Sequence, residues 1–353
     1  MRVLSLFSTC LLFPVSSCLC NHEKSAPIAG SGGKLNIAIW SNYIGESVFK
    51  DFEAATGIKI VMSNYSSNEE LLAKLQAGAT GYDLIVPSDY MISIMMELKL
   101  LERIDKSKIP NLAFVEPEFL ARDYDRENLV SLPYTWTSTG IGVNTEKTKN
   151  KFTSWRQFFE DPEIAGHVSM LDDVRESVGA ALNYSGKSIN SIDPGDLAAA
   201  KTVLVKNRAR VKAYTSEPLD MLTSGDVWVA QIYSSDAMQA NRNTNGKIEF
   251  SIPTEGSTLS IDNMAIPRGA KNIEAALKFI NFIYQPSVNK VFVESVLGGP
   301  VVKGVAQVLK KELQTNPILF PAEEVRHRFE MIHDIGEQAG AWDRVWTEVK
   351  AAN

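Results

Sequence analysis

Aromatic and acidic side chains recur at the points where predicted strands end. Residues 34–39 alternate apolar residues with small or polar ones, as a strand does, and the segment 40–43 follows directly. Residues 82–87 have the composition of a buried strand and lead into 88–90. Open α/β sheets bind ligands at the carboxyl ends of their strands, so residues at these positions are candidates for a binding site. The candidates are Trp40, Ser41, Tyr43, Ser88, Asp89, Tyr90, Asp173, Glu176, Tyr233, Asp236 and Asp262.

This set of side chains favours a flexible organic cation as the ligand. It contains aromatic rings and carboxylates but no Lys, Arg or His that would pair with an anionic substrate. Carboxylates accept charge-assisted hydrogen bonds from ammonium groups, and the faces of aromatic rings attract cations. A methylene chain against aromatic walls adds about 0.8 kcal/mol for each buried CH₂ group.

Other interpretations of the same residues remain open. A cleft with carboxylates and stacking aromatics also suits a sugar, and Asp173, Glu176 and Asp262 could supply the carboxylate pair of a glycosidase. Trp40 and Tyr43 could be ordinary core residues. The chain beyond residue 20 has no cysteine nucleophile and no G-x-S-x-G or H-E-x-x-H motif, and its histidines lack the spacing of metal ligands. We therefore expect a binding protein rather than an enzyme, with no cofactor and no metal.

Alternating strands and helices must position these candidates. Such alternation is typical of parallel sheets covered by helices, and it occurs in both halves of the chain. The polar, β-branched segment 135–139 between two strand-like runs is predicted to cross from one lobe to the other. The fold class is therefore α/β, with two lobes facing a cleft. Strands are predicted at 34–39, 58–62, 82–87, 167–171, 211–214, 227–233 and 262–267, and helices at 47–56, 69–77, 91–100, 155–160, 177–183, 197–207, 273–284 and from 306 onward.

The length and charge of the chain narrow its class. Its 353 residues, 44% of them hydrophobic, are enough for two globular lobes with their own cores. The formal net charge of -6, without a basic block or stripe, argues against nucleic acid as a partner.

The first residues have the composition of an export signal. Residues 3–15 form an apolar run that is too short for a normal transmembrane helix, and Val15-Ser-Ser-Cys18 resembles a bacterial lipobox. We expect residues 1–17 to be a signal peptide, Cys18 to be lipidated, and 18–33 to be a flexible tether. Cys20 is the less favoured site because Leu19 precedes it. The alternative is an ordinary secreted protein whose cysteines have no role.

A series of motifs along the body of the chain resembles one protein family. The motifs are Trp40–Tyr43, Thr56–Ile60, Tyr82–Tyr90, Ile104–Lys108, Leu132–Trp136, Gly140–Asn144, Asp172–Glu176 and Asp262–Pro267. Their order and spacing are similar to those of the spermidine/putrescine-binding proteins of bacterial ABC importers. The resemblance implies the two-lobed periplasmic-binding-protein fold (type II), with mixed sheets, two crossovers and hinge-like closure on the ligand. We expect lobe 1 to contain 34–139 and 264–302, and lobe 2 to contain 140–263 and 303–353.

The resemblance also implies roles for residues of the first lobe. Trp40 and Tyr43 are expected to stack on the aliphatic chain of the ligand, with Ser41 on the same wall. Ser88 and Tyr90 are expected to line the first lobe.

The resemblance also implies roles for residues of the second lobe and of the strand that crosses between the lobes. Asp262 matches the main carboxylate that binds an ammonium group in the family, and Asp173 and Glu176 are expected to face one amine. Asp172, beside the same helix start, is expected to cap that helix. Ser216 matches a serine of the family's pocket.

Four positions that the family pattern covers concern the choice of ligand, and two of them, at Ser260 and in 331–334, are departures that bear on the preference. Tyr233 stands where the family usually has Trp, and Asp236 matches the Trp-x-x-Asp pattern of the putrescine-specific branch. Ser260 replaces an aromatic residue, and the segment 331–334 lacks the Gln of spermidine binders. We expect putrescine to bind at least as tightly as spermidine. The predicted protein is a monomeric periplasmic lipoprotein, anchored to a bacterial membrane, that delivers a polyamine to the permease subunits of an ABC transporter.

Overall fold

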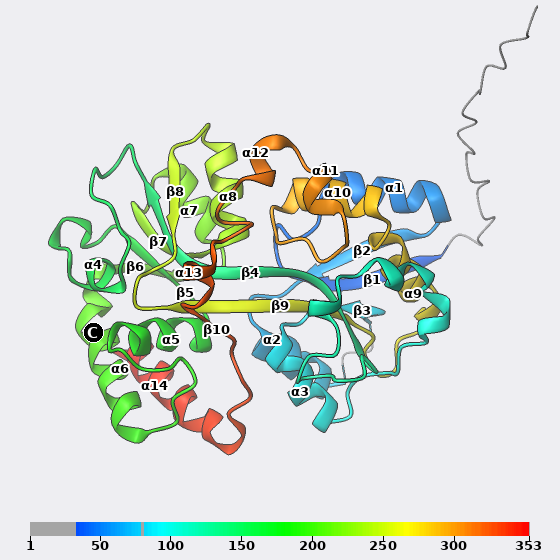
Figure 1. Ribbon diagram of the computed structural model, residues 1–353. Coiled ribbons are helices and arrows are strands. Elements are labelled where there is room, and N and C mark those ends of the chain that lie inside the picture. The colour runs from blue at the N-terminus through cyan, green and yellow to red at the C-terminus, as the bar shows by residue number, and fades with distance from the viewer. Residues whose placement is uncertain (1–32, 79–80, 353) are drawn as a thin grey trace, which may run out of the picture.

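Two α/β lobes lie side by side in the computed structural model, which describes residues 33–78 and 81–352 (Figure 1). Two long strands, β4 (Ser131–Asn144) and β9 (Ser257–Ala265), run from one lobe to the other. The predicted signal peptide, the lipidation site Cys18 and almost all of the predicted tether lie outside the described residues. Within the described part of the chain, no helix combines the length and the apolar character that a membrane crossing requires.

The first lobe is a sheet covered by helices on both faces. Side chains of Leu35, Ile37 and Ile39 pack in one core cluster, whereas Ala38 packs in another, as the two-residue period of a strand requires. The alternation of apolar with small or polar residues at 34–39 is the pattern from which this strand is predicted. The elements are β1 (Lys34–Ile39), β2 (Lys59–Asn64) and β3 (Leu84–Ile85), with α1 (Glu46–Thr56), α9 (Ile273–Ile283) and α10 (Pro286–Val296) on one face and α2 (Asn68–Gln76) and α3 (Asp89–Glu97) on the other.

The ends of these helices follow local sequence signals. Gly57 ends α1 in the left-handed conformation, with φ of 70°, where a side chain would be strained. Ser67 caps α2 by accepting a hydrogen bond from the backbone N–H of Glu70, as expected for a serine at that position. The short 3₁₀ helices Lys106–Lys108, Pro110–Phe114 and Pro117–Phe119 lead from α3 towards β4.

The second lobe repeats the same layered plan. Trp155, Phe158 and Leu204 pack with strand residues in one core cluster, and Leu222 and Ile232 belong to another. The elements are β5 (Val168–Leu171), β6 (Val211–Thr215), β7 (Val229–Tyr233) and β8 (Ile248–Ser251), with α4 (Trp155–Glu160), α5 (Val174–Tyr184), α6 (Pro194–Asn207) and α14 (Ala339–Ala351) on one side and α7 (Pro218–Ser224) and α8 (Ser234–Asn243) on the other.

The strand order explains how the two lobes are joined. The strands follow the path β2-β1-β3-β9-β4-β7-β5-β6, so β9 and β4 are neighbours at its centre. The first part of β4 pairs antiparallel with β9, and from Thr139 onward β4 pairs with β7 and β8 of the second lobe. The predicted crossing at 135–139 is thus the middle of one continuous strand.

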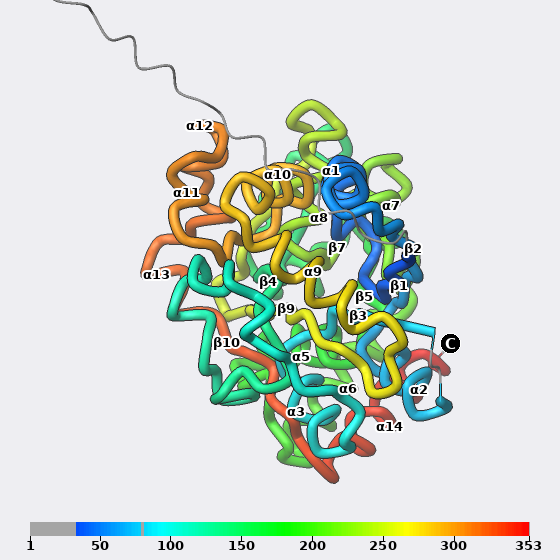
Figure 2. Tube along the Cα trace, turned by 90° about the vertical axis from the view of Figure 1, so that its right-hand side faces the viewer, coloured from blue at the N-terminus to red at the C-terminus, as the bar shows by residue number. Residues whose placement is uncertain are grey.

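The chain returns to the second lobe later than the expected boundary at residue 303. Val305, Leu309, Leu313 and Leu319 pack in the core of the first lobe, because α10 leads directly into this segment. The connecting elements are α11 (Val305–Val308), α12 (Lys311–Gln314), α13 (Glu323–Arg326) and β10 (Phe329–Glu330), and α14 then joins the second core. The Cα trace from the side shows α11 and α12 beside α10 (Figure 2).

Candidate functional site

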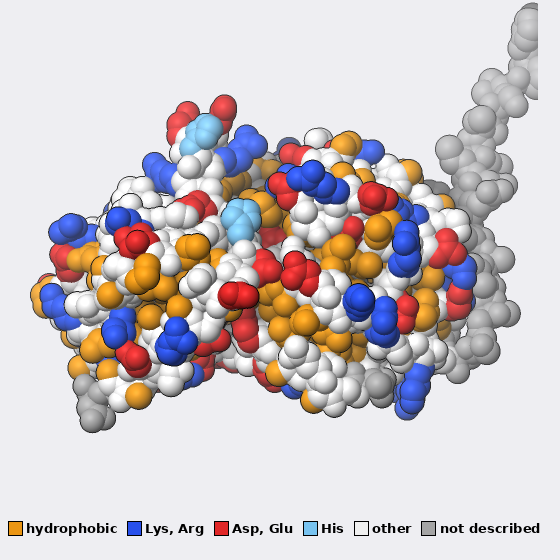
Figure 3. All heavy atoms as spheres, turned by 90° about the horizontal axis from the view of Figure 1, so that it is seen from below, with side chains coloured by type: hydrophobic (Ala, Val, Ile, Leu, Met, Phe, Trp, Pro, Cys, Tyr) orange, Lys and Arg blue, Asp and Glu red, His pale blue; other side chains and the backbone are white. Residues whose placement is uncertain are grey.

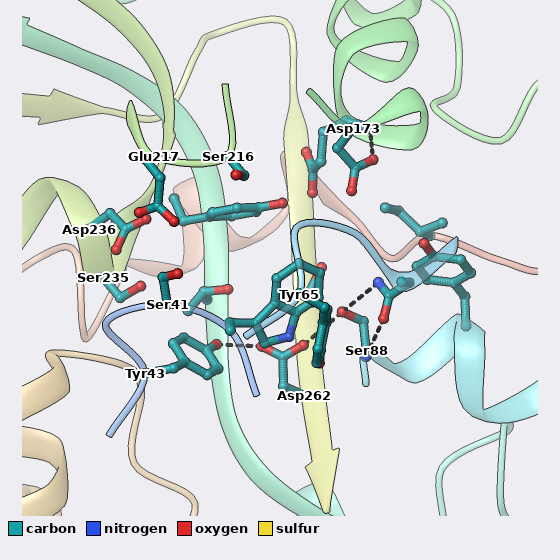
Figure 4. A pocket seen from close by; sticks show the side chains of 18 residues that line it. Ser41, Tyr43, Tyr65, Ser88, Asp173, Ser216, Glu217, Ser235, Asp236 and Asp262 are labelled. Atoms are coloured by element: carbon teal, nitrogen blue, oxygen red, sulfur yellow. Dashed lines mark hydrogen bonds between the residues drawn. The ribbon is translucent and has the colours of Figure 1, made fainter. Parts of the chain in front are cut away.

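A cavity between the two lobes gathers almost all of the candidate residues. Its volume is about 670 Å³ with the open mouth included. Every candidate except Asp89 lines it, and Figure 4 shows their side chains around the crossing strands. In a space-filling view from below, acidic side chains gather at the waist between the lobes (Figure 3). The lining residues are Trp40, Ser41, Tyr43, Tyr65, Asn68, Ser88, Tyr90, Thr137, Asp173, Glu176, Ser216, Glu217, Tyr233, Ser235, Asp236, Ser260, Asp262 and Ile332.

Asp262 is a buried carboxylate held by hydroxyl groups of the first lobe. It lies on β9, opposite Thr135 of β4, with only 4% of its surface exposed. The hydroxyl of Tyr43 donates a short hydrogen bond to Oδ2, and Ser88 Oγ donates to Oδ1 at 2.7 Å. Burial raises the pKa of Asp262 to about 6, although these two hydrogen bonds pull in the opposite direction. The site thus presents a carboxylate whose ionised form lacks a cationic partner.

The side chain of Asn68 holds Ser88 in place through two hydrogen bonds. Asn68, at the start of α2, accepts a hydrogen bond from the backbone N–H of Ser88 at 3.1 Å. Its side-chain nitrogen donates to Ser88 Oγ at the same distance. Because both ends of the Asn68 amide are engaged, the hydroxyl proton of Ser88 is directed at Asp262.

Trp40 and Tyr65 form an aromatic wall of the cavity. Their ring centroids are 4.6 Å apart with an interplanar angle of 58°. The indole N–H of Trp40 donates to the carbonyl of Val86 at 3.0 Å, and the hydroxyl of Tyr65 donates to the same carbonyl. With their polar atoms engaged in this way, both rings offer their faces and edges to a ligand.

Asp173 and Glu176 face the cavity from the start of α5. Asp173 is the N-cap of this helix, since its Oδ1 accepts hydrogen bonds from the backbone N–H groups of Arg175 and Glu176 at 2.8 and 3.1 Å. The expectation that Asp172 caps the helix is therefore wrong. Asp172 points outward and pairs instead with Lys350 of α14 at 2.7 Å.

The carboxylate of Glu176 accepts a hydrogen bond from a hydroxyl group of the crossing strand β9. Thr258 of β9 donates to it, with oxygen–oxygen distances of 2.8 and 3.0 Å. Burial raises the pKa of Glu176 to about 8, and the charge of Asp173 adds to this rise. Burial also raises the pKa of Asp173. Both pKa values would fall if a cation came to lie between the two groups.

Arg175 lies close to this pair, but its guanidinium has other partners. Its nitrogens donate to the carbonyl of His333 at 2.9 Å and to Oδ1 of Asn190 at 3.0 Å. The guanidinium stacks over Trp342 in its own lobe and over Tyr90 of the first lobe, at 4.6 and 5.6 Å from the ring centroids. Arg175 therefore lies beside the Asp173 end of the cavity, outside its lining.

Tyr90, from the first lobe, also lies at the Asp173 end of the cavity and forms a hydrogen bond with Glu69. Its hydroxyl donates to Oε1 of Glu69 at 2.9 Å. Burial raises the pKa of Glu69 to about 7, and the charge of Asp173 acts in the same direction. Four acidic or phenolic groups thus surround one guanidinium.

Asp236 and Glu217 lie at the opposite end, together with three serines. Asp236 is in the first turn of α8 and Glu217 follows the turn after β6. Burial raises the pKa of Asp236 to about 7, and the charges of Glu217 and Asp220 raise it further. Figure 4 shows the two carboxylates close together, beside Ser41, Ser216 and Ser235.

Asp89 does not line this cavity, contrary to the expectation. It is the first residue of α3, and its carboxylate turns away from the cavity towards backbone N–H groups. Oδ1 accepts from Tyr90 at 2.8 Å and Oδ2 accepts from Ile261 at 3.1 Å. Asp89 therefore joins α3 to the crossing strand.

Several lining residues were not among the candidates. Tyr65 directly follows β2, which ends at Asn64 rather than at the predicted residue 62, so the strand-end criterion would have found it with the correct boundary. Glu217 and Ser235 are neighbours of named candidates. The others are Asn68, Thr137, Ser260 and Ile332.

The chemistry of the cavity is that of a receptor for cations. Five carboxylates line it together with five aromatic rings, and its lining contains no Lys, Arg or His among the described residues. Nor do those residues contain a cluster of three or more His, Cys, Asp or Glu suited to a metal ion. Carboxylates arranged in this way can accept hydrogen bonds from ammonium groups while the rings pack against a carbon chain.

Comparison with known proteins agrees with this geometry. Residues 47–321 match the family described as bacterial extracellular solute-binding protein. A putrescine/cadaverine-binding protein of Pseudomonas aeruginosa is 34% identical over 335 residues, covering 91% of this chain and 95% of the relative. The spermidine/putrescine-binding periplasmic protein of Escherichia coli is 34% identical over 331 residues, covering 93% and 94%. A solved lipoprotein structure from Treponema pallidum superposes with a TM-score of 0.79 at 31% identity, covering 90% of this chain and 99% of that one.

Proposed function

This chain belongs to the bacterial extracellular solute-binding proteins, and we propose that it binds a polyamine between its lobes and delivers it to an ABC transporter. The resemblance to the spermidine/putrescine-binding family and the two-lobed α/β fold that it implies are confirmed. The relatives are named as binding proteins, and we propose that this chain likewise binds its ligand without converting it.

The single observation that carries the proposal is the lining of the cavity. Its carboxylates are buried against aromatic rings, and the nearest guanidinium, that of Arg175, already has its own partners. Isolated buried carboxylates are costly, so this arrangement is stable in ionised form only with a cationic ligand. A polyamine supplies cations at both ends of an apolar chain.

The site residues take the following roles in this proposal. Asp262, oriented by Tyr43 and Ser88, binds one ammonium group. Trp40 and Tyr43 pack on the methylene chain, as expected from the sequence. The remaining lining residues flank the ligand in two groups: Ser41, Ser216 and Asp236 near one end, and Tyr90, Asp173, Glu176 and the hydroxyl of Tyr233 near the other.

The location of the protein follows from the same reasoning. We propose that residues 1–17 direct export, that Cys18 carries the lipid, and that the monomer works in the periplasm, tethered to a membrane. Two features support this: the lipobox-like Val15–Cys18 in the sequence, and a relative of similar structure that is itself a lipoprotein. Delivery to permease subunits follows from the family, whose members serve transporters.

A thermal-shift panel followed by titration calorimetry tests the proposal. The panel contains putrescine, spermidine, maltose and a ferric salt, each added to the purified protein. We expect the two polyamines to raise the melting temperature and maltose and iron to leave it unchanged, because ligands that bind only the folded state stabilise it. Stabilisation by maltose alone would favour a sugar receptor. Consumption of putrescine during incubation would show that the protein is an enzyme.

A further inference from the structure

One end of the cavity contains polar side chains that the protein itself leaves without partners. We call it the serine end, and it consists of Ser41, Ser216, Glu217, Ser235 and Asp236 (Figure 4). Ser41 comes from the first lobe and the other four from the second, so the two lobes meet here around a ligand.

The carboxylates elsewhere in the cavity differ in this respect. Asp262 accepts two hydroxyl hydrogen bonds, Asp173 accepts two backbone N–H groups, and Glu176 accepts the hydroxyl of Thr258. Among the described residues, no side chain or backbone group donates to the carboxylates of Asp236 or Glu217, and neither forms an ion pair.

Asp236 is the stronger indication of a ligand group, because its carboxylate is buried as well as unpartnered among the described residues. Only 9% of its surface is exposed, and it opens into the cavity. Two neighbouring carboxylates without a counter-charge repel each other, and the raised pKa of Asp236 reflects burial and this repulsion. A buried, unpartnered acid in a ligand cavity therefore marks a place for a cationic group of the ligand.

The number of acceptors indicates which cationic group fits best. The serine end presents two carboxylates and three hydroxyls, whereas an ammonium group has only three N–H donors. A guanidinium at the end of an alkyl chain has five N–H donors in a planar fork, which suits paired carboxylates. The hydroxyl groups of the three serines also line the cavity, so they are available to a broad planar group.

We propose that the serine end is a guanidinium subsite, so that the protein also binds an amine with a guanidinium group at the far end of its carbon chain. The proposal rests on the proposed function, because the amine end of such a ligand would use Asp262. The proposal gives Glu217 a role in ligand selectivity. Asp236 accepts hydrogen bonds from either an ammonium or a guanidinium group, whereas Glu217 is the second carboxylate that the guanidinium group requires.

Titration calorimetry on the purified protein with two ligands of equal spacer length tests this inference. Putrescine carries two ammonium groups on four methylenes, and agmatine replaces one of them with a guanidinium. We expect wild-type protein to bind agmatine at least as tightly as putrescine. Glu217→Gln should weaken agmatine binding by about tenfold or more, since hydrogen bonds to charged groups are lost, and should affect putrescine much less.

Asp220→Asn is the matched control. Asp220 is exposed on α7, three residues from Glu217, and it does not line the cavity. Its substitution by Asn removes the same charge as Glu217→Gln does. It should leave the ratio of the two affinities unchanged. Circular dichroism verifies that both variants are folded.

The possible outcomes separate this inference from the proposed function. If putrescine binds and agmatine does not, the guanidinium subsite is wrong and the polyamine receptor stands. Equal weakening of both ligands by Glu217→Gln would also overturn the subsite. If neither putrescine, spermidine nor agmatine binds, the proposed function fails together with the inference.

Discussion

The hydroxyl of Ser88 donates to the carboxylate of Asp262 at 2.7 Å, although 174 residues separate the two in the chain. Ser88 immediately precedes α3 and Asp262 lies on β9, and the two residues also form an isolated bridge between their backbones. The main carboxylate of the cavity is therefore fixed by a helix start of the first lobe while the strand that carries it continues into the second lobe. Two predictions depend on this carboxylate.

Asp262→Asn should weaken polyamine binding by more than tenfold. Removing one partner of a buried charge pair costs about 2–5 kcal/mol, much of it from leaving the ligand ammonium unpaired. Titration calorimetry with putrescine measures the change. Asp89→Asn is a suitable control, because Asp89 is similarly buried and close by, but its carboxylate lies outside the cavity lining and accepts hydrogen bonds from backbone N–H groups. Unchanged affinity in a folded Asp262→Asn protein would contradict the role given to this residue.

The affinity for polyamines should rise with pH between about 6 and 8. The pKa values of Asp262, Asp236 and Glu176 are raised to about 6, 7 and 8, so these carboxyls hold protons in the empty cavity. A bound cation favours their ionised forms, and ligand amines stay charged throughout this range, so binding must release protons. Calorimetry in buffers of different ionisation enthalpy detects this release, and a binding enthalpy independent of the buffer would refute it.

The free energy of unfolding of the ligand-free protein should change in the opposite sense. A carboxyl with a raised pKa in the folded state contributes stability that is complete below its unfolded pKa of about 4 and is lost as the pH rises through the folded value. The contribution of these groups therefore decreases from about pH 4 to 8. Asp236→Asn should flatten the slope, as melting curves at several pH values would show.

Putrescine should bind at least as tightly as spermidine. Asp236 offers a carboxylate for the second amine of a short diamine, whereas Ser260 and Ile332 offer no aromatic ring or amide to a longer ligand. One well-made charged hydrogen bond is worth about 1.5–3 kcal/mol, so the preference is expected to be modest. Competition of the two polyamines for one site measures it. Asp236→Asn should reduce putrescine affinity more than spermidine affinity, and a clear preference of wild type for spermidine would refute the prediction.

Gly299→Ala should destabilise the protein, because Gly299 packs closely against Trp136 of the crossing strand β4. An added Cβ would lie 1.9 Å from Cε2 of the Trp136 indole, and the Gly299 N–H also donates to the Trp136 carbonyl at 2.8 Å. Overpacking of this kind typically costs about 1–3 kcal/mol, which calorimetric melting resolves. Gly81→Ala, where an added Cβ meets nothing within 4 Å, is the matched control. Equal melting temperatures of the two variants would argue against close packing at Trp136.

Cys18→Ser should abolish lipid attachment. The prediction depends on the lipobox-like Val15–Cys18. The variant should remain unprocessed or become soluble, and it should not incorporate labelled palmitate. Normal labelling and partition into detergent would show that Cys18 is not the acylated residue, and the same assay on Cys20→Ser would then identify the site.

Most of the lining residues could be predicted from the sequence because they lie at the ends of predicted strands. Apolar runs followed by polar and aromatic residues indicate where the strands of a parallel sheet end. Residues 40–43 and 88–90 are predicted as binding residues on this basis. The criterion cannot tell which way a side chain turns. Asp89 stands between two lining residues, yet it bonds to the N–H of Ile261, which only the folded chain brings near.

Other lining residues depend on features that no local pattern contains. Thr137 and Ser260 face the cavity because the antiparallel register places them opposite each other in the middle of the crossing strands. Ile332 comes from a segment near the end of the chain without a strand signal, and it follows β10, which pairs with the distant strand β9. Register and long-range packing are properties of the whole fold.

The central position of β9 also has a consequence for biosynthesis. β1, β2 and β3 are complete by residue 85, but β3 pairs with β9 at Ala265, and the core helices α9 and α10 extend to Val296. A growing chain cannot close the first lobe until these late segments have left the ribosome. Long-range strand pairing of this kind also slows folding. The first lobe therefore remains unfolded until most of the chain has been synthesised, and an unfolded polypeptide can be threaded through a membrane channel.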